Sequence, residues 1–206
     1  MKYLVYTSIF LFLSLGLIAQ EEGYKIGDAA TDFSLKNTAN NVKGIDQKVS
    51  LSDYKNVKGF IVIFTCNHCP YSKDYEDRII NIHRTYALRG YPVVAINPND
   101  EERVPEDSYS NMKVRAREKG FPFAYLHDST QEIAKAYGAT KTPHVYLVQK
   151  KNEQNIVRYI GAIDDNRDED SVGENYLCNA IDDLLKGELP SKSSAKAFGC
   201  TIKWKQ

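Results

Sequence analysis

The sequence has no excess of charge of either sign. It carries 27 Lys and Arg and 27 Asp and Glu among 206 residues, so its formal net charge is zero. Proteins that bind nucleic acid or an anionic membrane surface usually carry a basic excess, and none is present here. We therefore expect no nucleic-acid partner. Fixed-period repeats and low-complexity tracts are also missing, and a chain of this length can bury one sizeable core, so we expect one domain.

Long uncharged runs are missing except at the start of the chain, where Lys2 precedes the uncharged residues 3–19. A basic start, an apolar middle and a small residue at a plausible cleavage point are typical of a secretory signal. We predict a signal peptide over residues 1–19 and a domain over 20–206. The protein is then periplasmic or secreted, without stable membrane insertion after cleavage. An uncleaved anchor helix is the alternative, although the run is at the short limit for crossing a bilayer.

Cysteines are few, and only two of them lie close together in the sequence. Cys66 and Cys69 form a Cys-x-x-Cys motif, whereas Cys178 and Cys200 lack the spacing of a second one, which argues against a four-thiolate zinc site. Export would permit disulfides. A Cys178–Cys200 disulfide that ties down the C-terminal tail is one interpretation, and an inert, buried Cys178 is the other.

The motif stands between an apolar run and an amphipathic pattern. Residues 60–64 predict a buried strand, and Tyr71, Tyr75, Ile79, Ile82 and Tyr86 recur at helical spacing after it. Strand, motif and helix in this order place Cys66 at a helix N-terminus, where backbone N–H groups and the helix dipole stabilise a thiolate. With His68 adjacent, we predict a Cys66 pKa below the free value of about 8.5. Cys69 is then the resolving thiol.

The remaining patterns alternate between strand and helix. Strands are predicted over residues 91–97, 121–126, 144–148 and 155–160, the last two as a hairpin. A helix is predicted from Pro105 to Lys119, another after the capping box Ser129–Glu132, and a closing one over 173–185. A short hairpin is expected within residues 23–48. These elements predict an α/β fold with a central mixed sheet flanked by helices.

Several segments together resemble the redoxins of the thioredoxin superfamily, in their alkyl hydroperoxide reductase/thiol-specific antioxidant, peroxiredoxin-like branch. The similar segments are 27–35, 49–54, 64–71, 95–100, 105–108, 137–144, 163–165 and 199–204. The resemblance implies a thioredoxin-like fold with an N-terminal hairpin and a strand–helix insertion. It also implies a cis peptide bond before Pro143, which brings the backbone of Thr142 beside Cys66. We therefore assign substrate contact to Thr142, Pro143 and Asn67.

The sequence differs from this family in the residues that precede the reactive cysteine. Peroxidatic cysteines follow the pattern Pro-x-x-x-Thr-x-x-Cys, and aligned on Cys66 these positions are Gly59 and Ile63. The Trp that precedes the first thioredoxin cysteine is also missing, as is the buried carboxylate of the preceding strand. The group that accepts the proton of Cys69 stays open between His68 and water.

We predict a thiol–disulfide oxidoreductase in which Cys66, Cys69 and His68 carry the chemistry through a mixed disulfide. Its partners are protein thiols and disulfides or small thiols, and it needs no cofactor and no metal. One alternative is a thiol peroxidase that reduces hydroperoxides. Another is a Cu(I)-binding module with Cys66, Cys69 and His68 or His144 as ligands. The sequence leaves open the direction of electron flow, the upstream donor or acceptor and the oligomeric state.

Overall fold

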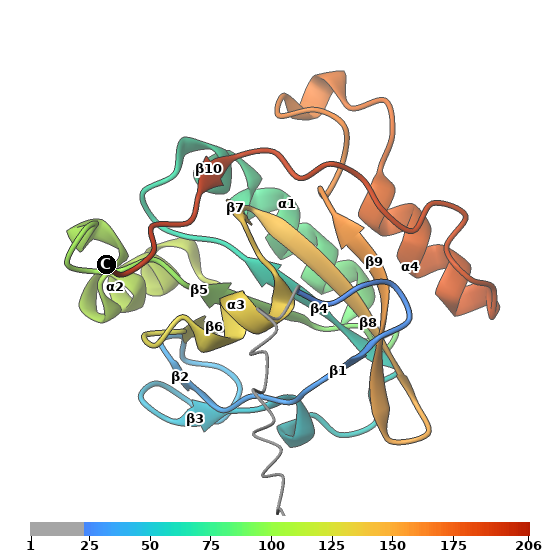
Figure 1. The fold of residues 1–206 in the computed structure, drawn as a ribbon, viewed down its shortest axis with the longest axis horizontal. Helices are drawn as coiled ribbons and strands as arrows, with labels where there is room; N and C mark the ends of the chain where they lie inside the picture. The colour runs from blue at the N-terminus through green and yellow to red at the C-terminus, as the bar shows by residue number, and fades with distance from the viewer. Residues whose placement is uncertain (1–22) are drawn as a thin grey trace, which may run out of the picture.

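The computed structural model describes residues 23–206, and a mixed eight-stranded sheet runs through its centre (Figure 1). The strand order is β1-β9-β8-β4-β5-β6-β2-β3. The three strands β4, β5 and β6 are parallel, and all other neighbours in the sheet are antiparallel. The bounds are β1 Ala29–Ala30, β2 Leu35–Asn37, β3 Lys48–Val49, β4 Gly59–Phe64, β5 Val93–Asn97, β6 Ala124–His127, β8 His144–Lys151 and β9 Gln154–Gly161.

Two hydrophobic cores cover the two faces of this sheet. One contains residues of α1 (Pro70–Tyr86), α2 (Tyr109–Lys119) and α4 (Tyr176–Lys186), and the other contains α3 (Glu132–Tyr137) and the N-terminal segments. Within β4, Ile61 and Ile63 belong to the first core, whereas Phe60, Val62 and Phe64 belong to the second. Because both faces are covered, the strand is apolar throughout rather than alternating.

The α/β fold with a central mixed sheet is confirmed, and so are the β8–β9 hairpin and the β2–β3 hairpin near the N-terminus. The region from Pro105 differs from the expected single helix. Pro105–Asp107 form one 3₁₀ turn, and α2 begins separately after Ser108, whose hydroxyl accepts from the backbone N–H of Asn111. Asp107 thereby leaves the helix and points inward, fully buried.

Two further helix starts were predicted wrongly. The capping box Ser129–Glu132 does not form: α3 begins after Gln131, which has a positive φ of 63°, and the Asp128 carboxylate accepts from the N–H of Ala134 at 2.8 Å. The carboxylate of Asp128 thus takes the place of the Ser129 hydroxyl as the acceptor at the start of this helix. The closing helix begins at Tyr176 rather than at 173.

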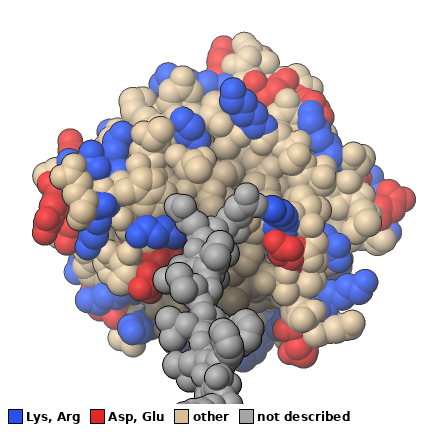
Figure 2. Space-filling model, in the orientation of Figure 1, with Lys and Arg blue, Asp and Glu red and all other residues tan. Residues whose placement is uncertain are grey.

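A small second sheet lies near one end of the main one. It pairs β7 (Lys141–Thr142) with β10 (Cys200–Thr201), which brings the C-terminal segment beside the end of β8 (Figure 1). The predicted signal peptide lies outside the described residues. Within residues 23–206, no helix is long and apolar enough to cross a membrane. Figure 2 shows basic and acidic side chains interspersed over one face, in line with the balanced composition.

Candidate active site

The Cys-x-x-Cys turn joins the end of β4 to the start of α1. All six residues of β4 are buried, which fixes the position of the strand, and Pro70 is the first residue of the helix. Pro suits this position because its missing N–H is not needed there. Cys69 is the N-cap residue, so Cys66 lies three residues before the N-cap and outside the helix. The backbone N–H of Cys69 nevertheless donates to the sulfur of Cys66.

The Cys66 side chain is enclosed by polar groups, with only 3% of the residue exposed. Its Sγ lies 3.2 Å from Oγ1 of Thr142, 3.5 Å from Nδ1 of His68 and 3.7 Å from Oγ of Ser72. These neighbours come from the turn, from α1 and from β7, which are brought together only in the folded chain. Cys66 is a free thiol.

Burial raises the pKa of the Cys66 thiol to about 11, and the negative charge of Asp107 acts in the same direction. Hydrogen bonds from Thr142, the backbone of Cys69 and Ser72 lower this pKa but do not compensate. The predicted lowering of the pKa is therefore wrong for this closed state of the site. The hydrogen bonds to the sulfur favour the thiolate, but removal from water disfavours it more strongly.

His68 is held by a buried carboxylate. Its Nδ1 lies 2.6 Å from Oδ2 of Asp107, closer than the 3.5 Å to the sulfur of Cys66. The same ring nitrogen faces both groups, so a proton on Nδ1 is shared between carboxylate and sulfur. The carboxylate of Asp107 thereby orients the imidazole next to the thiol.

Asp107 is the functional residue that the sequence analysis missed. Besides His68, its carboxylate accepts from the backbone N–H of Asn67 at 2.6 Å and from the amides of Asn97 at 3.1 Å and Asn99 at 2.8 Å. It supplies, from another element, a buried carboxylate that the strand before the motif lacks. The segment 105–108 resembles the family, and an acidic residue within it could have indicated a carboxylate at the site.

Asn67 uses its side chain inside the protein. Its Nδ2 donates to the carbonyl oxygen of Glu106 at 2.7 Å, and its Oδ1 accepts from the hydroxyl of Tyr125 at 2.9 Å. Both ends of the amide are thus engaged in holding the turn. Its assignment as a substrate contact stays a prediction.

Cys69 forms a disulfide with Cys200, with the two Cα atoms 6.0 Å apart. The suggested Cys178–Cys200 disulfide is therefore wrong, and Cys178 is a free thiol on α4. The sequence could not show that the C-terminal segment returns to the Cys-x-x-Cys turn, because that return depends on the pairing of β10 with β7.

Thr142 lies where the sulfurs meet. The bond between Thr142 and Pro143 is cis, as the family resemblance implied. The hydroxyl of Thr142 contacts Cys66, while its carbonyl oxygen lies 3.4 Å from Sγ of Cys69. In the register of the small sheet, Cys200 is opposite Thr142. One residue thus borders all three cysteines of the site.

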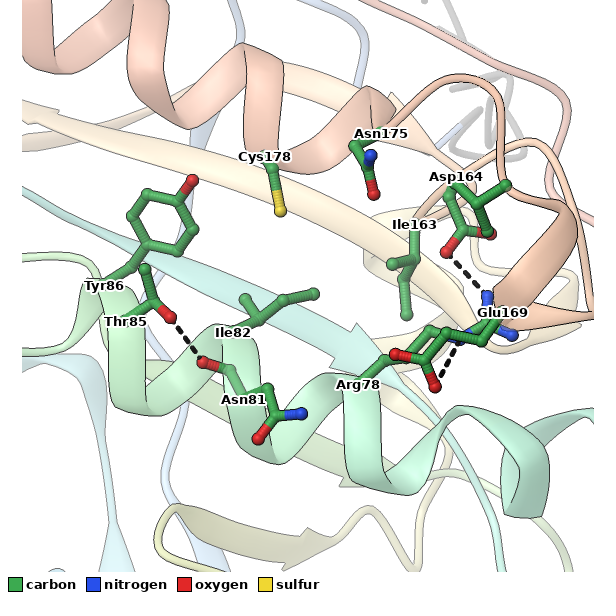
Figure 3. Close-up of a pocket in the computed structure, with 11 residues that line it drawn as sticks. Arg78, Asn81, Ile82, Thr85, Tyr86, Ile163, Asp164, Glu169, Asn175 and Cys178 are labelled. Atoms are coloured by element: carbon green, nitrogen blue, oxygen red, sulfur yellow. Dashed lines mark hydrogen bonds and ion pairs between the residues drawn. The ribbon is translucent and has the colours of Figure 1, made fainter.

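Cys178 belongs to a separate cavity of about 400 Å³ between α1 and α4 (Figure 3). Arg78, Tyr86 and Asp164 also line this cavity, whereas Cys66 and Cys69 do not. Burial raises the pKa of the Cys178 thiol, although a hydrogen bond with Tyr86 lowers it in part. This thiol has no other sulfur among its described partners.

The ligand atoms of Cys66, His68 and Asp107 lie within 4.8 Å of one another, so these residues could hold a metal ion. One thiolate, one imidazole and one carboxylate suit a borderline cation such as zinc better than Cu(I), which prefers sulfur. His144, the other suggested copper ligand, accepts the N–H of Thr140 at Nδ1, and burial lowers its pKa to about 4.

A Cys-x-x-Cys turn at the start of a helix, a cis proline facing it and a mixed sheet covered by helices on both faces define a protein of thioredoxin-like fold. The chain matches the AhpC/TSA family over residues 26–160, which is more than half of its length. The chain belongs to the AhpC/TSA family.

Known proteins and structures resemble the chain to different extents. The thiol-disulfide oxidoreductase ResA of Oceanobacillus iheyensis is 28% identical over 131 residues, which cover 63% of this chain and 62% of ResA. The chain therefore spans less than two thirds of that relative. An uncharacterised conserved protein from Geobacillus kaustophilus is 37% identical, with a TM-score of 0.78 and coverage of 88% and 93% of the two chains.

A more distant structure shows the same fold. It is the thioredoxin domain of a thiol-disulfide oxidoreductase from Bacteroides vulgatus, 17% identical, with a TM-score of 0.51. The match covers 68% of this chain and 91% of that domain. At this identity the similarity extends to the fold alone.

Proposed function

We propose that this protein is an exported thiol–disulfide oxidoreductase that uses Cys66 and Cys69 as its redox couple. The observation that carries the proposal is the convergence of a free thiol and a disulfide on Thr142, with Cys66 on its hydroxyl and Cys69 at its carbonyl. A thiol next to a disulfide is the arrangement in which exchange takes place. The name of the relative ResA describes the same class of reaction.

In the reducing direction, the thiolate of Cys66 attacks one sulfur of a partner disulfide, and the other partner sulfur leaves as a thiolate. The Cys69 thiolate then attacks Sγ of Cys66, and the second partner sulfur leaves. Cys66 and Cys69 end as a disulfide, and the partner gains two electrons. The reverse sequence oxidises the partner. His68, held by Asp107, is placed to exchange the proton of Cys66.

Cys69 must first be released from Cys200, because a sulfur in one disulfide is not available to resolve another. The described state is thus a closed, oxidised form, in which the high pKa of Cys66 keeps its thiol protonated. Thr142 and Pro143 remain the proposed docking edge for an extended partner.

The export part of the proposal places the protein in the periplasm or outside the cell. It rests on the uncharged segment 3–19 and on the disulfide, since structural and redox disulfides persist in oxidising compartments.

The test is to trap the mixed disulfide. A reduced Cys69→Ser/Cys200→Ser variant treated with oxidised glutathione should keep glutathione on Cys66, because no thiol remains nearby to resolve it. The matched control, Cys66→Ser/Cys200→Ser, should carry none at position 66, and both are assayed by mass spectrometry of intact protein and peptides. Failure of the first variant to hold glutathione on Cys66 would refute the proposal.

The peroxidase alternative has weaker support. Ile63 stands where the family frame has Thr, and because its side chain is aliphatic it can offer no hydrogen bond to a peroxide; it is fully buried in the core with α1. Gly59 occupies the position of the frame's Pro.

The cluster of Cys66, His68 and Asp107 supports metal binding as a second candidate function. Zinc or copper retained by the reduced protein after gel filtration, and lost in Cys66→Ser, would support it. Retention in that variant would place the ion elsewhere.

A further inference from the structure

The C-terminal segment lies directly against the Cys-x-x-Cys turn. β10 runs antiparallel to β7, with Cys200 opposite Thr142, and the N–H of Ile202 donates to the carbonyl of Thr140 at 3.2 Å. Figure 1 shows the two short strands side by side where the C-terminal segment crosses the end of the main sheet. This pairing occupies the backbone edge that the proposed function assigns to an extended partner.

The segment fits this place closely at Gly199. Its φ is +139°, and a Cβ at this position would overlap the carbonyl oxygen of Thr142. Only glycine combines this backbone conformation with so close an approach. The strand therefore reaches the Thr142 carbonyl without a side chain in between.

Amide side chains hold the next residues of the segment. Asn99 accepts the N–H of Lys203 at 2.8 Å, and Gln131 donates to the carbonyl of Lys203 at 2.9 Å. The same Gln131 accepts the N–H of Lys205 at 2.7 Å. The segment is thus seated on both sides of Cys200, so that residue is presented to Cys69 by a folded strand rather than by a loose tail.

We propose that Cys200 is a third redox cysteine of this site. In the closed form the thiolate of Cys66 attacks Sγ of Cys69, a Cys66–Cys69 disulfide forms, and Cys200 leaves as a thiolate with β10. The inference rests on the proposed function, because the Cys66–Cys69 disulfide it generates is the form that exchanges with a partner. The supporting observation is that all three cysteines border Thr142.

The step balances without any further reagent. The bond between Cys69 and Cys200 breaks as the bond between Cys66 and Cys69 forms, so the sulfur of Cys66 is oxidised by one formal electron, the sulfur of Cys200 is reduced by one, and Cys69 stays at the disulfide level. The proton that Cys66 loses is matched by the one that Cys200 gains. The number of free thiols in the protein stays the same.

The same step opens the docking edge. Once Cys200 is released, no covalent bond holds β10 against β7, and an extended partner strand can replace it by forming the same type of backbone pairing. The chain's own segment thus stands in for a substrate in the closed form. Generation of the reactive disulfide and access to it are thereby coupled.

The experiment follows the disulfides by peptide mass in the Cys178→Ser background. Trypsin places Cys66 and Cys69 together on peptide 59–73 and Cys200 on peptide 197–203. The protein is reduced, oxidised with one equivalent of diamide, held at acid pH as the Cys69–Cys200 form, and then shifted to alkaline pH without oxidant. Samples are acid-quenched, alkylated and digested without reduction.

We expect the cross-link between the two peptides to give way in part to an internal disulfide in 59–73, with 197–203 alkylated. Substitution Cys66→Ser should abolish this conversion and leave the cross-link intact. Absence of conversion overturns the role of Cys200. The two proposals are separated by Cys200→Ser treated with diamide: if it forms the internal disulfide the proposed function stands, and if it does not, that function fails.

Discussion

The two free thiols of the protein, Cys66 and Cys178, make an instructive comparison. Burial raises the pKa of both. Cys66 lies among a histidine, two hydroxyl groups and a neighbouring disulfide, whereas Cys178 projects from α4 into a cavity of mixed polar and apolar lining (Figure 3). The direction of the pKa shift is therefore the same for both thiols in the closed form.

The difference lies in what each sulfur can reach. Cys66 has a second sulfur and a proton carrier nearby, so a transient loss of its proton can lead to a new bond. Cys178 has no second sulfur among its described neighbours, and the ion pair of Arg78 with Asp164 lies in the same pocket. In the proposed function, reactivity at Cys66 is thus a property of the assembled cluster and not of the thiol alone.

The largest effect, on the free energy of unfolding, should come from a substitution in the cavity that holds Cys178. Arg78 is 8% exposed and pairs with the 2%-exposed carboxylate of Asp164 at 2.7 Å, in the cavity that holds Cys178. Arg78→Met should lower the free energy of unfolding by about 3–5 kcal/mol, because it leaves a buried carboxylate without its partner. Denaturant unfolding measures this loss, and the alkylation rate of Cys66 in the native protein should not change.

Arg89 gives the matched control for that measurement. It pairs with Asp182 at 3.2 Å, but both side chains are more than 40% exposed. Arg89→Met should cost less than about 1 kcal/mol, since water screens the pair. Equal losses in the two variants would contradict the assignment of a structural role to the buried pair.

An intermediate effect should come from Asp107→Asn, which removes the buried negative charge near Cys66. The charge of Asp107 raises the pKa of Cys66, so removing it should lower that pKa and speed alkylation at neutral pH by about tenfold. The rate is measured as a function of pH in the Cys69–Cys200 oxidised form. Cys178 in the same sample reports any general loosening, and an unchanged or higher pKa of Cys66 would contradict the prediction.

The smallest effect should come from Cys178→Ala. Loss of one half-buried sulfur removes little packing, so the free energy of unfolding should fall by about 1 kcal/mol. The rate of disulfide exchange with glutathione should equal that of the wild type. A fall in that rate would show that Cys178 takes part in the chemistry and would remove the contrast between the two thiols.

Much of this architecture follows from the sequence. A continuous apolar run identified β4 and a helical pattern identified the helix after the motif, because both faces of β4 and one face of α1 are buried. The cis bond at Pro143 came from the family resemblance rather than from local chemistry. Helix starts were less predictable: Asp128 competed with Ser129 as a cap, and Pro105 opened a single turn that ends at Asp107.

The site itself was only partly predictable, and long-range contacts explain why. Cys66, Cys69 and His68 are neighbours in sequence, so their proximity could be inferred. Asp107 reaches His68 across 39 residues, and Cys200 reaches Cys69 across 131. No local pattern encodes such contacts, and the depth of burial that raises the pKa of Cys66 depends on them as well.

The amide side chains that hold the C-terminal segment determine how the site responds to salt concentration. The bonds from Asn99 and Gln131 to the backbone of residues 203 and 205 join groups without net charge. Dissolved ions have no charge pair to screen there, so these hydrogen bonds should be equally strong at high and at low salt concentration.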